Sequence, residues 1–261
     1  MSFLRALGST GLEVSALGLG TVKLGRNQGV KYPSGFELPD DASATALLEL
    51  AADVGINLLD TAPAYGSSEE RLGKLLRKRE RWVLGSKCGE EFENGHSRFD
   101  FSAAHTRFSV ERSLRRLRTD WLDFVLIHSD GNDLDILERS DCVATLLRLK
   151  EEGLVRAVGM STKTDAGGCA AARLLDVVML TWNREQRDEE ALRTARELGK
   201  GVLVKKGLMS GHVQDSGENS LRGSMARVLH EPGISSMIVG TINPAHLEAN
   251  VTLARDILAG G

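Results

Sequence analysis

Short apolar runs alternate with amphipathic stretches along the whole chain. The runs that predict β-strands are residues 17–19, 57–59, 82–86, 124–127, 154–159, 177–180, 201–204 and 237–240. Most of them are continuously apolar rather than alternating, which is typical of parallel strands that are buried on both faces. The pattern therefore predicts eight parallel strands.

The stretches between these strands carry recognisable helix ends. Asp40 or Asp41 opens the first helix and Gly55 closes it. Ser67, followed three residues later by Glu70, forms a capping-box pattern that opens the second helix. Apolar residues at i, i+4 and i+7 stripe the third helix at Val110, Leu114 and Leu117. Further helices are expected around residues 134–152, 165–174, 188–198, 221–231 and 244–258.

Eight strands, each followed by a helix, predict an α/β protein with the closed (β/α)8 architecture of a TIM barrel. We expect residues 1–261 to form a single domain. Before the first strand, residues 6–15 have the pattern of a β-hairpin that turns through residues 9–11 and closes the bottom of the barrel.

A doubly wound open sheet is the competing fold for a dinucleotide-binding protein. It requires a G-x-G-x-x-G motif directly between the first strand and its helix. Gly18 and Gly20 supply the first two glycines, but the next glycine is displaced to Gly25, and a long loop then precedes the helix. The barrel is therefore favoured.

Composition excludes several classes of protein. The 33 Lys and Arg residues against 36 Asp and Glu residues give a net charge of −3, so charge provides no reason to expect nucleic acid or an anionic membrane as partner. Three cysteines without paired spacing and six scattered histidines argue against a disulfide framework and a metal site. With no apolar run of membrane-spanning length and no signal-peptide core, we expect a cytoplasmic protein.

Four polar residues fall at or after consecutive strand ends. Asp60 follows the second strand, Lys87 ends the third, His128 ends the fourth, and Tyr65 lies in the loop after Asp60. The carboxyl ends of barrel strands share one mouth, so these side chains should converge there. Singly, each has an ordinary explanation, such as a turn cap, an exposed aromatic, a surface lysine or a strand-end histidine. Their joint placement indicates a catalytic site.

The chemistry of this set suits transfer of a hydride to or from a carbonyl carbon. Such a reaction needs a proton donor for the developing alkoxide, and a tyrosine with an ordinary pKa of about 10 is a poor acid. A neighbouring ammonium, Lys87, should lower the pKa of Tyr65, while Asp60 keeps that ammonium charged. Neutral His128 could hydrogen-bond the substrate oxygen.

These segments resemble the aldo-keto reductase family. The stretch 57–73, NLLDTAPAYGSSEERLG, is similar to the family signature around its aspartate and tyrosine. The stretches GSK at 85–87, DWLDFVLIH at 120–128 and VRAVGMS at 155–161 resemble the lysine strand, the histidine strand and the start of the nicotinamide site. The likeness extends from Arg5 to Asn250 in the order of the family.

The resemblance implies that Asp60, Tyr65, Lys87 and His128 form a catalytic tetrad with Tyr65 as general acid and base. It also implies an extended nicotinamide dinucleotide, with NADP expected and NAD possible. Gly20, Thr21 and Ser161 would lie near the nicotinamide. The pyrophosphate would lie under the loop that contains Lys205, Lys206, Gly207 and Leu208, and the adenosine end would be held by Gly240, Thr241, Asn243, His246 and Asn250.

Three positions depart from the family pattern. Met179 stands where many members have a glutamine for the carboxamide, and Lys205 stands where many place an aromatic ring on the nicotinamide. The segment that reads the adenosine 2′-phosphate often carries Arg or Lys, whereas here it offers Thr241, Asn243 and His246. Lys205 cannot stack on the ring, but a second cation would help to anchor the pyrophosphate.

The expected partner is a small carbonyl or alcohol substrate. We expect the protein itself to be a monomer or a weak homo-oligomer. The chain ends at Gly261, soon after the last helix, so we expect an open pocket without a C-terminal tail across it. An apolar wall could come from the loop 90–102, with Phe92, His96, Phe99 and Phe101, and from Trp182. These aromatic residues could equally be packing residues.

Two other functions remain open at this point. A cofactor-binding redox sensor or regulatory subunit would bind the dinucleotide tightly but turn over slowly. A barrel lyase would use Lys87 as a Schiff-base nucleophile, although that function leaves Asp60 and Tyr65 less well explained.

Overall fold

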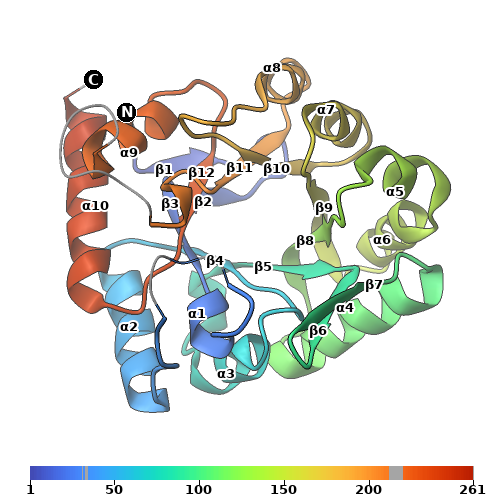
Figure 1. Cartoon of the computed structure of the whole chain (residues 1–261), viewed down its shortest axis with the longest axis horizontal. Helices are drawn as coiled ribbons and strands as arrows, with labels where there is room; N and C mark the ends of the chain where they lie inside the picture. Colours follow the sequence, from blue (N-terminus) through green and yellow to red (C-terminus); the bar gives the residue numbers. More distant parts are fainter. Residues whose placement is uncertain (31, 33–34, 212–219, 261) are drawn as a thin grey trace.

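The computed structural model describes residues 1–30, 32, 35–211 and 220–260. Eight parallel strands close into a barrel around the centre of the molecule (Figure 1). In barrel order these are β3 (Leu17–Gly20), β4 (Leu58–Asp60), β5 (Val83–Cys88), β8 (Leu122–His128), β9 (Val155–Ser161), β10 (Val177–Thr181), β11 (Gly201–Lys205) and β12 (Ser236–Val239), which pairs again with β3. All eight predicted strands are confirmed, and so is the closed α/β barrel.

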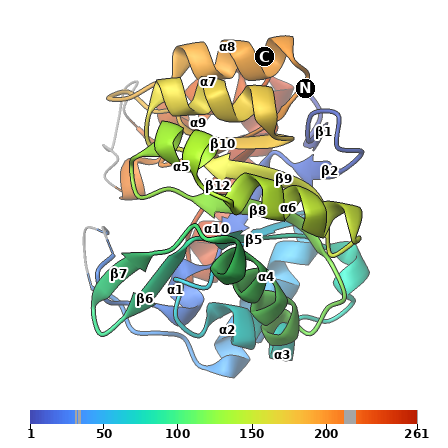
Figure 2. The same ribbon diagram turned by 90° about the vertical axis from the view of Figure 1, so that its right-hand side faces the viewer.

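Helices surround the strands on the outside (Figure 2). They are α2 (Asp41–Asp53), α3 (Ser68–Leu75), α4 (Ala103–Leu117), α5 (Asp133–Arg139), α6 (Cys142–Glu151), α7 (Asp165–Leu174), α8 (Glu189–Glu197), α9 (Leu221–Leu229) and α10 (Pro244–Ala259). Shorter turns of helix are α1 (Val22–Gly25), η1 (Arg79–Arg81) and η2 (Met209–Gly211). Their apolar faces and the outward faces of the strands form one buried layer. No helix in the described part of the chain is long and apolar enough to cross a membrane.

Two predicted helix features are wrong. The helix expected over 134–152 is two helices, because Ser140 adopts an extended backbone between α5 and α6 and its hydroxyl donates to the Ile136 carbonyl at 2.6 Å. The capping box at Ser67 does not form, since the Ser67 side chain accepts no capping hydrogen bond. By contrast, the Asp40 carboxylate caps α2 by accepting from the Ser43 amide. Asp40 is one of the two residues that were predicted to open this helix.

The predicted N-terminal hairpin is confirmed. β1 (Leu4–Ala6) pairs antiparallel with β2 (Glu13–Ser15), and the turn contacts the chain just before β11, where the Ser9 amide donates to the Gly199 carbonyl at 2.9 Å. Leu7 and Val14 are fully buried and pack with the residues inside the barrel, among them Leu58, Val83, Phe124, Leu126 and Leu203. The hairpin therefore closes the end of the barrel where the strands begin.

A second hairpin lies where a loop was expected. Residues 90–102 contain β6 (Glu90–Glu93) and β7 (His96–Phe99), which pair antiparallel with Glu90 opposite Phe99. Asn94 and Gly95 form the two-residue turn with positive φ angles of 51° and 84°, the conformation that an Asn-Gly turn favours. Because this hairpin directly follows β5, it stands at the end of the barrel where the strands finish (Figure 2).

Candidate active site

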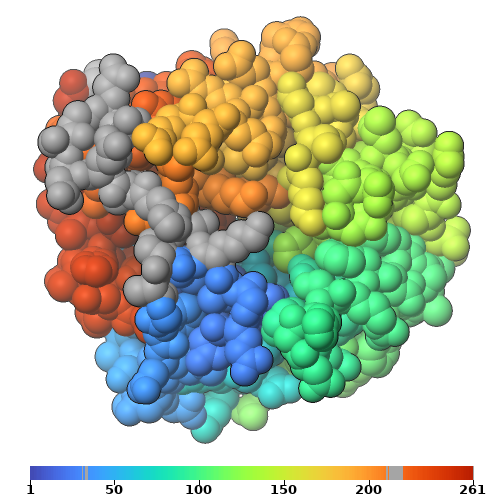
Figure 3. Space-filling view, viewed as in Figure 1, coloured from blue at the N-terminus to red at the C-terminus, as the bar shows by residue number. Residues whose placement is uncertain are grey.

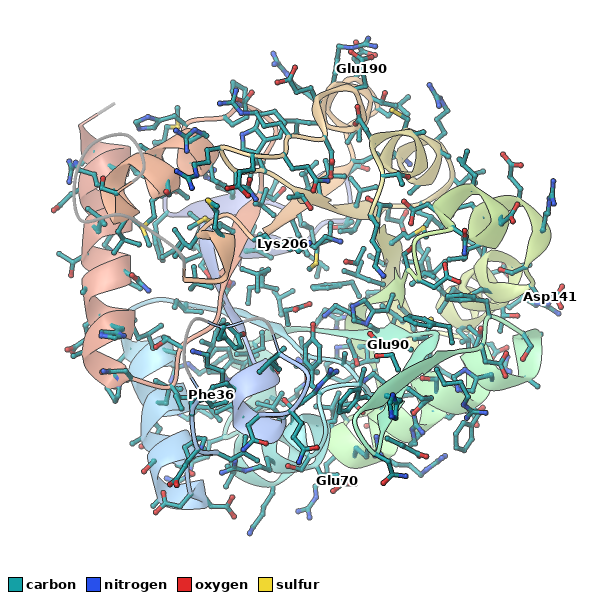
Figure 4. The ribbon with its side chains drawn as sticks, viewed as in Figure 1. Phe36, Glu70, Glu90, Asp141, Glu190 and Lys206 are labelled. Carbon is teal, nitrogen blue, oxygen red and sulfur yellow. The ribbon has the colours of Figure 1, made fainter. Side chains whose placement is uncertain are left out.

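A cavity of about 420 Å³ lies at the end of the barrel where the strands finish. Asp60, Tyr65, Lys87 and His128 all line it, so the structure brings together the four residues that the sequence singled out. A small hollow is visible near the centre of the face shown in Figure 3. In Figure 4 the labelled Lys206 and Glu90 lie on either side of the middle of the molecule.

Asp60 and Lys87 form a buried ion pair at the floor of this cavity. The Lys87 ammonium lies 2.7 Å from Asp60 Oδ1 and also donates to the Thr61 carbonyl at 2.9 Å. β4 and β5 are neighbours in the barrel, which places the two side chains at one end of the sheet. Burial of the ammonium lowers the pKa of Lys87, but Asp60 and Tyr65 outweigh it and the pKa is raised. Lys87 is therefore a fixed cation, which disfavours it as a Schiff-base nucleophile.

Tyr65 lies beside this cation, with the Lys87 ammonium 4.7 Å from the centre of its ring. Lys87 lowers the pKa of Tyr65, as expected, but it does not decide the net shift. Burial raises the pKa of Tyr65 to about 12, and Lys87 offsets only part of that rise while Asp60 adds to it. The phenol of Tyr65 is therefore protonated through the neutral range.

His128 lies edge-on to Tyr65, with ring centres 6.3 Å apart. Its Nδ1 atom lies 2.7 Å from Oε2 of Glu90, but this contact is not a hydrogen bond. Burial lowers the pKa of His128, and Glu90 opposes that change without reversing it. His128 is therefore a neutral imidazole at pH 7.

The twelve residues expected to bind a cofactor divide into two groups. The cavity is lined by Gly20, Ser161, Lys205, Lys206, Gly207, Leu208, Gly240 and Asn250. Thr21, Thr241, Asn243 and His246 are not among its lining residues.

Hydrogen bonds within the protein account for three of the four residues outside the lining. Thr21 is fully buried, and its hydroxyl donates to the Asp60 carbonyl while accepting from Ser68. Thr241 accepts from the Asn243 amide at 3.1 Å, and Asn243 caps α10. His246 is exposed on the first turn of that helix. A role for these four residues in cofactor binding remains a prediction.

Lys205 extends across the cavity from the end of β11. Its ammonium donates to Ser161 Oγ at 2.9 Å and to the Thr162 carbonyl, and Ser161 is the sheet partner of Met179, which also lines the cavity. Burial, reinforced by Lys206 and Lys87, lowers the pKa of Lys205 to about 7. The two departures from the family pattern thus meet at one place in the site.

Sequence reasoning missed part of the lining. Lys23, Tyr32 and Lys163 also face the cavity, which brings its lysines to five (Lys23, Lys87, Lys163, Lys205 and Lys206) against a single lining carboxylate, Asp60, in the described part of the chain. This excess of cations suits an anionic ligand. Lys163 could have been found, because it follows the end of the strand that carries Ser161.

The expected aromatic wall is not found in this cavity, since Phe92, His96, Phe99, Phe101 and Trp182 are absent from its lining. Phe92 instead packs under the Arg26 guanidinium at 3.2 Å, and Phe99 stacks on Phe101. Trp182 borders a separate cavity beside α8. Among the described residues, no group of three His, Cys, Asp or Glu side chains is placed to hold a metal ion.

The sequence and the fold were then compared with known proteins. The model of the Aldo/keto reductase family matches residues 16–256. The chain belongs to this family. Aldo-keto reductases are oxidoreductases, and the closed barrel with its N-terminal hairpin matches their fold.

Several known members are similar to this chain. It is 39% identical over 165 residues to L-galactose dehydrogenase of Arabidopsis thaliana, and the aligned region covers 60% of this chain and 48% of that protein. It is 32% identical over 161 residues to the aldo-keto reductase YhdN of Bacillus subtilis, and here the aligned region covers 60% of this chain and 46% of that protein. The matched region thus spans about half the length of these curated relatives.

Solved structures match more completely. A Pseudomonas aeruginosa protein assigned to the aldo-keto reductases is 54% identical, with a TM-score of 0.89, over 98% of this chain and 95% of that chain. The holo form of an aldo-keto reductase from Bacillus halodurans, 24% identical with a TM-score of 0.80, shares the fold over 99% of this chain and 96% of that chain.

Proposed function

We propose that this aldo-keto reductase is an NAD(P)(H)-dependent oxidoreductase that interconverts a small aldehyde or ketone with the corresponding alcohol or sugar. The observation that carries the proposal is the convergence of Asp60, Lys87, Tyr65 and His128 on one cavity, with the Lys87 ammonium 2.7 Å from Asp60 and 4.7 Å from the Tyr65 ring centre.

Each member of this tetrad has one task. Tyr65, protonated at neutral pH, donates to the substrate oxygen and acts as the general acid and base of the reaction. Lys87 is the nearby cation that stabilises negative charge developing on the phenol oxygen, and the buried Asp60 carboxylate holds Lys87 charged and in place. His128 presents its imidazole on the other side of Tyr65.

The residues present fit a nicotinamide dinucleotide. The four cavity lysines outside the tetrad, Lys23, Lys163, Lys205 and Lys206, complement a pyrophosphate. Lys205, Lys206, Gly207 and Leu208 would hold the pyrophosphate side, and Gly20 and Ser161 would hold the nicotinamide side. When bound, this group supplies or accepts the hydride.

We propose NADP as the cofactor, with NAD as the second candidate. The segment expected to read the 2′-phosphate offers Thr241, Asn243 and His246, and none of these carries a permanent positive charge. Measured affinity for both cofactors therefore belongs in the first experiment.

The proposed substrates are small molecules with several hydroxyl groups or a simple carbonyl. One relative is named for its action on L-galactose, and the cavity lining includes polar side chains such as Ser161 and Asn250. We further propose that residues 1–261 act as one cytoplasmic domain, as a monomer or weak homo-oligomer, without nucleic acid or membrane partners.

The experiment is a fluorescence titration of the protein with NADPH and with NADH, followed by steady-state assays over a panel of aldehydes, ketones and aldoses. We expect micromolar or tighter binding of one cofactor to both wild type and Tyr65→Phe. Turnover should fall at least about 100-fold in the variant, the lower end of what general acid catalysis contributes.

Other results would favour a different function. Tight binding without turnover across the panel would favour a redox sensor. Failure to bind either cofactor would overturn the proposal.

A further inference from the structure

Two of the three cysteines of the chain meet in the buried layer between the barrel and its helices. Cys88 is the last residue of β5, and Cys142 is the first residue of α6. Their Sγ atoms lie 3.8 Å apart, although 54 positions separate the two residues in the chain. Both thiols are free and both side chains are fully buried. Neither residue lines the catalytic cavity, so the pair is separate from the tetrad.

The surroundings of the pair make Cys142 the more reactive of the two thiols. Cys142 begins a helix of 10 residues, where the positive end of the helix dipole stabilises a thiolate. The Cys88 thiol, with a smaller contribution from the Thr106 hydroxyl of α4, lowers the pKa of Cys142 against the effect of burial. The same contact, together with burial, raises the pKa of Cys88. A thiolate therefore forms more readily at Cys142 than at Cys88.

The separation of the two sulfurs is short enough for a disulfide to form with a small movement. An S–S bond of about 2.05 Å requires the Sγ atoms to approach by about 1.8 Å. Both side chains are enclosed by packed neighbours, so we expect part of this approach to move the ends of β5 and α6. The residue before Cys88 is Lys87, whose ammonium lies 2.7 Å from Asp60. A shift at the end of β5 therefore reaches the tetrad.

We propose that Cys88 and Cys142 form a redox modification site, which a peroxide converts into a reversible disulfide that slows catalysis by displacing Lys87. Formation of the disulfide is independent of the proposed function, whereas its effect on turnover rests on that function. In a reducing compartment such as the cytoplasm, disulfides of this kind are transient and act in redox sensing.

The chemistry balances with hydrogen peroxide as the oxidant. The Cys142 thiolate attacks one peroxide oxygen, the O–O bond breaks, and the products are a sulfenic acid and hydroxide. The hydroxide takes up the proton that Cys142 lost and becomes the first water. The Cys88 sulfur then attacks the sulfenic sulfur, the S–O bond breaks, and the hydroxyl leaves with the Cys88 proton as the second water. The pair of thiols loses two electrons and the peroxide gains them, and an external dithiol reverses the reaction by exchange.

The first test detects the disulfide and needs neither cofactor nor substrate. Cys169→Ala leaves Cys88 and Cys142 as the only cysteines, so a thiol titration of the unfolded protein reports on this pair alone. We expect hydrogen peroxide to remove both thiols and lower the mass by two hydrogen atoms, while the protein still runs as a single chain on a denaturing, non-reducing gel. Dithiothreitol should restore both thiols, and proteolysis of the oxidised protein should yield one peptide pair that joins residues 88 and 142.

Three results of this test would each overturn the proposal. They are the survival of both thiols in excess peroxide, their irreversible conversion to sulfinic or sulfonic acid, and a disulfide between two chains.

The second test measures turnover before and after oxidation. Oxidised Cys169→Ala should lose about 100-fold in kcat, the scale expected for a displacement of about 1 Å at a catalytic site, and should recover with dithiothreitol. Cys142→Ala is the matched control, because it cannot form the link and should keep its rate after the same treatment. A disulfide without loss of turnover, or an equal loss in Cys142→Ala, would overturn the coupling to Lys87. Absence of turnover in the reduced protein would contradict the proposed function, while the thiol titration would still decide whether the disulfide forms.

Discussion

Tyr65 illustrates how burial and charge compete at a single residue. Lys87 lies 4.7 Å from its ring centre and favours the phenolate, yet the pKa of Tyr65 rises to about 12 because removal from water disfavours the charged form more strongly. The sequence placed Asp60, Tyr65, Lys87 and His128 in one site, since strand ends meet at one mouth. It did not indicate how deeply each group is buried, and for that reason the net rise in the pKa of Tyr65 was not expected.

A second prediction at the level of single residues concerns Lys205. Burial and neighbouring lysines hold its pKa at about 7, so near pH 8 the side chain is mostly neutral. A pyrophosphate nearby would favour the ammonium, and binding should then take up as much as about one proton. Calorimetric titration with the preferred cofactor, at pH 8 in two buffers of different ionisation enthalpy, measures this uptake.

A matched pair of variants identifies the group that takes up the proton. Lys205→Met should abolish the uptake, whereas Lys74→Met, which removes an exposed lysine paired with Asp41, should leave it unchanged. Binding without proton uptake in wild type, or equal uptake in Lys205→Met, would show that Lys205 does not contact the anion.

At the scale of elements, the missed β6–β7 hairpin matters most, because it delivers Glu90 to His128. A signal was present: Asn94-Gly95 between two four-residue runs is a strong local indicator of a two-residue β-turn. The polar and charged residues of these runs hid the strands. The break between α5 and α6 is different, since apolar spacing continues through it and only the Ser140 backbone interrupts the helix.

The strand β5 carries both Lys87 and a glycine that the packing inside the barrel requires. A Cβ atom on Gly85 would lie 1.9 Å from the Phe124 ring of β8, so Gly85→Ala must displace that ring or the strand. We expect a loss of about 1–3 kcal/mol in the free energy of unfolding, typical of overpacking in a core. Urea denaturation followed by circular dichroism measures it.

Gly35→Ala is the matched control, because an added Cβ there meets no atom within 4 Å and Gly35 has no positive φ angle. Its denaturation midpoint should equal that of wild type. If the midpoint of Gly85→Ala is also unchanged, the close packing of β5 against Phe124 is incorrect.

For the whole molecule, periodicity alone was sufficient to predict the architecture. Eight continuously apolar runs with helices between them leave few alternatives to a closed parallel barrel, and the turn at residues 9–11 was enough to predict its lower plug. Charge distribution could not be predicted in the same way. The chain carries a net charge of −3, yet five lysines face the cavity, because they come from loops and strand ends whose side-chain directions only the folded chain determines.

The central claim is that Tyr65 and its neighbours catalyse hydride transfer involving a bound nicotinamide. The most direct measurement is a single-turnover reaction in which protein loaded with the preferred reduced cofactor is mixed with excess aldehyde, and loss of nicotinamide absorbance is followed by stopped flow. We expect stoichiometric oxidation by wild type, and oxidation at least about 100-fold slower by Tyr65→Phe carrying the same amount of cofactor. Equal rates in the two proteins would contradict the role of Tyr65, and no oxidation in wild type would contradict the account as a whole.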